Sequence, residues 1–279
     1  MMSQQLPELS KEQWAFLAVL GAFGGPVQIE VVGTIVPLLP GPLFDLFGKA
    51  EPQGWIRKVE DDRLVIGQDL PSAVQKKMDS VNTRKYLSWI VDKIVSERMR
   101  IKIGSLEWLY LLEKAGRSRE AAEAEIALAH DASNEGRQNE AQNFLNKAVT
   151  RLMTLCDEAE VRPLFLSATL NLSNISFAVG YGFKNIEKFL LKAQEVAEGL
   201  GDRRAHALLS LHIGRLYYFT DRRDDALVAL SLGLEEIEEL GDDDILLQSA
   251  LFLGLFYFIK GHFIEAVKHF EKAEQFFET

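Results

Sequence analysis

The chain has 279 residues, of which 47% are hydrophobic and 26% are charged, and its formal net charge is −10 at pH 7. The composition is typical of an ordinary globular protein, and the acidic balance argues against sequence-independent binding of nucleic acid or anionic lipid. A single cysteine, Cys156, excludes an internal disulfide framework.

Neither a signal peptide nor a membrane helix is predicted. The first residues lack the basic start and the apolar stretch of a signal peptide. The uncharged stretch over residues 163–183 contains several Ser, Thr and Asn side chains, and residues 245–259 are too short for a membrane helix of ~20 apolar residues. We therefore expect a cytoplasmic protein in which Cys156 is a buried, reduced thiol.

Taken in chain order, the first predicted helix begins at a capping box formed by Ser10 and Gln13. Its apolar residues recur at helical spacing and define one face: Trp14, Leu17, Leu20 and Phe23. A Gly-Gly-Pro sequence ends this helix and begins a second one through Val36, and a Pro-Gly-Pro sequence opens a third over residues 43–50.

A β-hairpin is predicted next, with strands over residues 55–59 and 63–66 and an acidic turn at 60–62. A short helix over residues 70–78 follows. Three helices and then a hairpin is the order of a winged helix, so we expect a winged-helix-like domain in residues 1–80.

Two stretches of this region, PLLPGPLFDLFGKAEPQGWI and LVIGQDLPSAVQKKM, resemble the winged-helix module of signal-transduction ATPases with numerous domains (STAND). The resemblance implies a larger bacterial signalling or transcription regulator, in which this module follows a nucleotide-binding domain and precedes a repeat sensor. Direct DNA binding is the alternative. The helix over 43–50 offers one lysine, and the acidic turn would repel phosphates, so a packing role is favoured. A small basic group remains: Arg57, Lys58 and Arg63.

Residues 81–118 are predicted to be a helical connector, with a long helix from Thr83 to about Ile103. Its basic side chains are interpreted as a solvated face, although they could instead meet the acidic repeats or an acidic partner.

The strongest signal is an internal repeat in residues 119–279, which carry a large acidic excess. Small, aromatic and alanine positions recur at an offset of 40 in the last two copies: Ile213, Gly214, Tyr217, Ala226 and Leu230, then Leu253, Gly254, Tyr257, Ala266 and Phe270. Four helix pairs are predicted, at about 119–156, 160–200, 203–240 and 243–279. The fold class is therefore mostly α, an α-α superhelix preceded by a small winged-helix domain with one β-hairpin.

This pattern resembles the tetratricopeptide repeat (TPR), in which the motif residues are packing residues and the first helices line a concave groove. The resemblance implies partner-binding groove positions at Asn171, Ile175, Leu208, Leu211, Arg215, Tyr218, Phe219, Leu251, Leu255 and Phe258. Arg215, Tyr218 and Phe219 are the residue types expected of binding anchors. The lysines of the carboxylate-clamp subfamily are missing, so no such clamp is expected. Burial of some of these side chains by tight curvature is the competing interpretation.

No catalytic, cofactor or metal motif is found. The Gly48-Lys49 pair lacks the other residues of a phosphate-binding loop, and the five histidines have no ligand set around them. We predict a non-catalytic sensor or interaction region without cofactor or metal. Its partner would be a protein, a peptide or another domain of a longer chain. No capping helix follows the last repeat, so we expect either further repeats in a longer protein, which is the favoured interpretation, or a partner that covers the last face. The alternatives are a DNA-binding regulator and a stand-alone TPR adaptor.

Overall fold

The computed structural model describes residues 8–59, 63–67, 70–96, 105–180, 182–241 and 249–277. They form two compact units, residues 1–124 and 125–279, and the boundary lies within one helix. The predicted boundaries at 80/81 and 118/119 stay predictions. The predicted acidic turn at 60–62, the end of the long connector helix and the start of the fourth pair lie outside the described residues.

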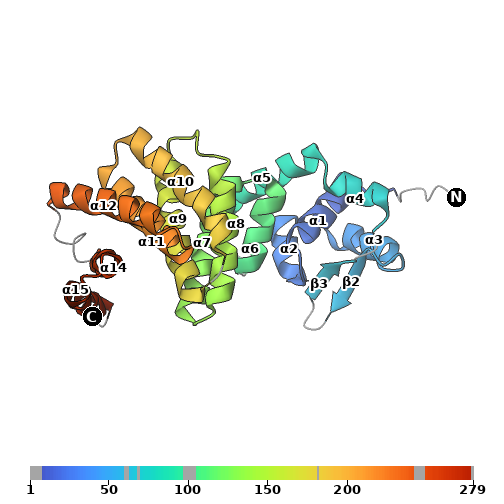
Figure 1. Cartoon of the computed structure of the whole chain (residues 1–279). Helices are drawn as coiled ribbons and strands as arrows, with labels where there is room; N and C mark the ends of the chain where they lie inside the picture. The colour runs from blue at the N-terminus through green and yellow to red at the C-terminus, as the bar shows by residue number, and fades with distance from the viewer. Residues whose placement is uncertain are drawn as a thin grey trace. The chain divides into compact units, whose positions relative to one another are not determined.

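The first unit is mostly helical and contains one small sheet (Figure 1). Its elements are α1 (Lys11–Ala22), β1 (Val27–Gln28), α2 (Ile29–Ile35), α3 (Pro40–Ala50), β2 (Ile56–Val59), β3 (Arg63–Ile66), α4 (Ser72–Met78), α5 (Val81–Ser96), α6 (Ser105–Ala115) and the start of α7 (Ser118–Asn134).

Helix α1 is the centre of this unit, because it packs against α2, α3, α4, α5, α6 and β3. The sequence predicted one apolar face, whereas the structure also buries Phe16 and Val19 completely. A helix surrounded by other elements is apolar on all sides, which explains why a one-sided pattern describes it incompletely.

The sheet has three strands in the order β1-β3-β2, all antiparallel. The predicted hairpin is present as β2 and β3, with Ile56 opposite Ile66 and Val59 opposite Arg63. The third strand corrects the sequence prediction, which continued the second helix back to Pro26. Val27 and Gln28 instead pair with β3, and α2 begins at Ile29.

The second unit is an array of helix pairs. After the rest of α7 it contains α8 (Gln138–Met153), α9 (Arg162–Val179), α10 (Phe183–Leu200), α11 (Arg203–Phe219), α12 (Arg223–Leu240), α14 (Ala250–Ile259) and α15 (Phe263–Phe277). Helices α9 and α10, α11 and α12, and α14 and α15 pack as pairs, and α9 also contacts α11, which contacts α14. The fold is therefore a solenoid of tetratricopeptide-like helix pairs.

Close approach within the pairs depends on glycine, as the repeat pattern predicted. A β-carbon on Gly214 would lie 2.6 Å from Cγ of Leu230 in α12, and one on Gly254 would lie 2.5 Å from the ring of Phe270 in α15. The recurring Leu-Gly sequence ends two helices: Gly201 after α10 and Gly241 after α12 both have left-handed backbones, with φ of 67° and 62°.

Candidate functional site

The predicted groove residues come from α9, α11 and α14, but their exposure differs. Leu211 is fully buried in a core cluster with Leu230 and Ile237, which is a correction, because a buried core side chain is not accessible to a partner. Leu208 and Leu255 are partly buried and pack against the same cluster.

The remaining groove residues are accessible to different degrees. Asn171 is exposed, whereas Ile175, Arg215, Tyr218 and Leu251 are half-buried. Phe219 is 54% exposed and Phe258 is 44% exposed. Phe258 packs edge-on against Phe263, with ring centroids 5.7 Å apart. The accessible part of the predicted surface therefore includes the C-terminal end of α11.

Three phenylalanines from three helices meet there. The Phe177 ring of α9 lies 5.4 Å from Phe183 at the start of α10 and 5.5 Å from Phe219 of α11, and Phe183 lies 6.0 Å from Phe219. Tyr218 contacts Phe219 edge-on at 5.6 Å. Together with Arg215 these residues form what we call the Arg215 cluster: Phe177, Phe183, Arg215, Tyr218 and Phe219.

Arg215 is held in this cluster by aromatic faces. Its guanidinium carbon lies 4.2 Å from the Phe177 ring centroid and 6.0 Å from that of Phe219, both within the range of cation–π attraction. Burial lowers the pKa of Arg215, because desolvation disfavours the charged form. The guanidinium nevertheless remains charged at neutral pH, since the ordinary pKa of an arginine lies far above neutrality.

The repeat pattern identified Arg215, Tyr218 and Phe219 as groove residues but not the two phenylalanines that complete the cluster. Phe177 occupies the aromatic slot of its repeat, and that slot predicted a packing role only. Phe183 follows the Gly180–Gly182 turn, where both glycines have positive φ, and nothing in the sequence places its ring beside Phe219.

Buried polar side chains join successive helix pairs near the cluster. His212 of α11 shares a 2.9 Å hydrogen bond with Ser173 of α9, and its ring lies 5.0 Å from Phe252 of α14. Burial lowers the pKa of His212 to about 3, with a smaller contribution from the charge of Arg215. His212 is therefore a neutral core residue at pH 7.

A second polar bond joins the preceding helices. Gln142 of α8 donates to Ser176 of α9 at 2.9 Å, and Ser176 donates in turn to the carbonyl of Leu172. In α7 the fully buried carboxylate of Glu125 accepts from Arg151 of α8 at 2.9 and 3.3 Å. The Gln142–Ser176 bond joins α8 to the next helix pair, and the Glu125–Arg151 ion pair joins the two helices α7 and α8. Both contacts hold the array together rather than offering groups to a ligand.

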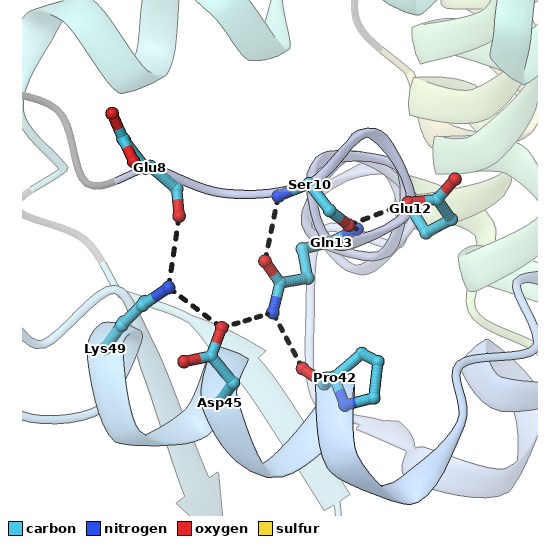
Figure 2. Close-up of polar contacts among 7 residues, drawn as sticks. All are labelled: Glu8, Ser10, Glu12, Gln13, Pro42, Asp45 and Lys49. Atoms are coloured by element: carbon cyan, nitrogen blue, oxygen red, sulfur yellow. Dashed lines mark hydrogen bonds and ion pairs between the residues drawn. The ribbon is translucent and has the colours of Figure 1, made fainter.

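In the first unit the polar side chains of α3, the helix that would contact DNA if this unit bound it, are engaged within the protein (Figure 2). Gln13 donates to the carbonyl of Pro42 at 2.7 Å and to Asp45 at 2.9 Å, while its own side-chain oxygen caps Ser10. Lys49, the one lysine of this helix, binds Asp45 at 2.8 Å and the carbonyl of Glu8 at 3.1 Å. Helix α3 thus uses its polar groups to hold the start of α1.

A surface cavity of about 480 Å³ also lies within the first unit. Ala18, Ala22 and Leu87 contribute buried apolar surface to it, and the charged residues on its lining include Asp79 and Lys114, which pair at 3.4 Å. Its charges are mixed in sign and mostly exposed, so it offers no defined binding group.

The described residues form no metal-binding cluster, and the single cysteine is buried. Across the described ranges, no cluster of three or more His, Cys, Asp or Glu side chains could hold a metal ion. Cys156 is buried and free, and burial raises the pKa of its thiol. None of the helices in the described part of the chain has the length and apolar character needed to cross a membrane.

No protein-family model and no curated protein matches the chain. Among solved structures, BtubC (BKLC) from P. vanneervenii is 21% identical with a TM-score of 0.46, over 70% of this chain and 78% of that one. The MamA RS-1 ArsTM double mutant is 17% identical with a TM-score of 0.37, over 69% and 93%.

A third similar structure is the STAND protein with a tetratricopeptide repeat sensor from Pyrococcus horikoshii, which is 16% identical with a TM-score of 0.33. The match covers 96% of this chain but 51% of that protein, so this chain spans about half its length. The assignment of tetratricopeptide-like repeats rests on the helix pairs and glycine contacts described above.

Proposed function

We propose that the second unit is a non-catalytic protein-interaction module whose partner binds at the Arg215 cluster. The observation that carries the proposal is the composition and exposure of this cluster. A largely exposed Phe219, a half-buried Tyr218 and a half-buried arginine lie together at the end of one helix. Aromatic residues and arginine dominate the energetics of protein interfaces, because aromatic rings bury much surface with few rotatable bonds and the guanidinium stacks on rings while donating hydrogen bonds.

The proposal extends to the class of the first unit and to the kind of protein to which the two units belong. We place the first unit in the winged-helix class, because its order of three helices, a strand after α1 and a hairpin gives the α-β-α-α-β-β sequence of elements. With the sequence resemblance described above, this supports a sensor region of a cytoplasmic signalling or transcription regulator. In such a regulator, partner binding at the repeats would change the output of the neighbouring domains.

Direct DNA binding by the first unit is less well supported. Lys49 is the candidate DNA contact from α3, and it is already bound to Asp45 and to a backbone carbonyl. An electrophoretic shift at low salt that Arg57→Glu abolishes would favour the DNA-binding alternative.

The interaction proposal is tested by selecting random peptides, displayed on phage, against the immobilised full chain. We expect enriched peptides to bind the wild type and to lose binding to a Tyr218→Ala, Phe219→Ala variant. A matched control is Val228→Ala with Leu232→Ala, which removes exposed apolar side chains of 71% and 43% exposure from α12. Failure to enrich any peptide, or equal binding to the cluster variant, would count against the proposal.

A further inference from the structure

Arg215 differs from the other arginines around it. Six other arginines of the second unit bind oxygen acceptors: Arg137, Arg151, Arg162, Arg203, Arg222 and Arg223. Among the described residues, Arg215 has no carboxylate or carbonyl within hydrogen-bonding distance, and its contacts are the rings of Phe177 and Phe219. In a segment with a large excess of carboxylates, this lack of an anionic partner distinguishes Arg215.

An arginine in this setting is prepared to bind an anion. The cation–π contacts hold the planar guanidinium in place, so little side-chain entropy is lost when a ligand binds. Partial burial removes water that would otherwise satisfy the N–H donors and weaken a charge-assisted hydrogen bond. A carboxylate matches the guanidinium by accepting two parallel hydrogen bonds.

Resting on the function proposed above, we propose that Arg215 binds the side-chain carboxylate of an Asp or Glu in the partner, next to an apolar side chain that packs on Phe219. The apolar neighbour follows from the 54% exposure of Phe219 beside the guanidinium. A carboxylate is favoured over a phosphate group for two reasons. Beside Arg215 the cluster holds three phenyl rings and the hydroxyl donor of Tyr218 but no second cation, and residues 121–279 carry a large acidic excess that repels a dianion more than a monoanion.

The test uses the peptides enriched on the wild-type chain. We expect an Asp or Glu beside an apolar residue to be common among them, and we expect replacement of that acid by its amide to weaken binding about ten- to a hundred-fold, as for loss of a charge-assisted hydrogen bond. Binding of fluorescein-labelled peptides is measured by fluorescence anisotropy against the wild type, Arg215→Gln and Arg215→Lys.

A double-mutant cycle separates a direct contact from a loss of structure. If Arg215 binds the acid, the acid-to-amide change weakens binding to the wild type but has little effect with Arg215→Gln, because the interaction is already absent. Arg215→Lys is expected to give an intermediate affinity. The peptide arm of the cycle uses the unaltered protein, so it is informative even if Arg215→Gln unfolds.

The outcomes are distinct for the two proposals. Enriched peptides that lack acids, or that bind equally well as amides, overturn the role of Arg215 and leave the interaction surface in place. Preferential binding of the same peptides with phosphoserine in place of the acid also overturns the carboxylate assignment. The absence of any enriched peptide overturns both proposals.

Discussion

His212 makes the stability of the second unit dependent on pH in a predictable direction. Its pKa is about 3 in the folded protein, against an ordinary value of 6.5, because the ring is buried between α9 and α14. Between these two values the unfolded chain binds a proton that the folded chain does not bind. Stability therefore falls as the pH falls below 6.5, and this histidine has no effect on it above about pH 7.5.

The size of the effect follows from the same two values. Each pH unit below 6.5 costs about 1.4 kcal/mol, so lowering the pH from 7.5 to 5 should remove about 2 kcal/mol of unfolding free energy through His212 alone. His212→Gln keeps a polar group for the 2.9 Å bond to Ser173 but cannot titrate in this range. We expect this variant to lose about 2 kcal/mol less than the wild type over the same interval.

The assay is urea denaturation at pH 7.5 and pH 5, followed by far-UV circular dichroism, which reports the helix content of the whole chain. A matched control is His130→Gln, which makes the same substitution at a side chain that is 75% exposed. Equal pH dependence in the wild type and His212→Gln would refute the reasoning, because it would mean that the folded protein protonates His212 as readily as the unfolded chain.

Three further predictions concern stability measured by the same denaturation assay. Gly214→Ala should lower the unfolding free energy by about 1–3 kcal/mol, because its β-carbon would overlap the facing helix. Gly199→Ala, which has open space around it, should raise the unfolding free energy by up to about 1 kcal/mol. A Gly214→Ala variant as stable as the wild type would contradict the close approach. Arg151→Met leaves the fully buried carboxylate of Glu125 without this ion pair and should lower the unfolding free energy by about 3–5 kcal/mol. Arg203→Met, in an exposed pair, should lower it by less than about 1 kcal/mol. Similar losses in the two variants would argue against the burial of the Glu125 carboxylate. Gln13→Ala removes a capping box and two bonds to α3 and should cost about 1–2 kcal/mol of unfolding free energy. No loss would mean that water replaces those bonds.

Sequence periodicity predicted the repeat architecture because its packing residues are determined by local geometry. Gly214 and Gly254 recur at a fixed offset, and the structure places each where a β-carbon would overlap the facing helix. The capping box at Ser10 was predicted correctly for the same reason, since it depends on residues three apart. Strand β1 was missed because two residues carry too little pattern, and only their pairing with β3 defines them as a strand.

The candidate site was predicted in part. The groove positions counted from the motif identified Arg215, Tyr218 and Phe219, but the same counting included Leu211, which the structure buries in the core. Position in a repeat determines the face of a helix on which a residue lies, whereas exposure depends on tertiary packing: Leu211 is buried against Leu230 and Ile237 of α12.

The amino-acid sequence alone therefore determined the helical character, the forty-residue period and the glycines that allow close packing, because each depends on residues near one another along the chain. Tertiary structure alone decided that Phe177, Phe183 and Phe219 meet around Arg215, and that among the described residues this guanidinium has aromatic rings and no anion as partners. Those contacts join three helices, and their formation depends on the angles between helix pairs, which no local pattern encodes.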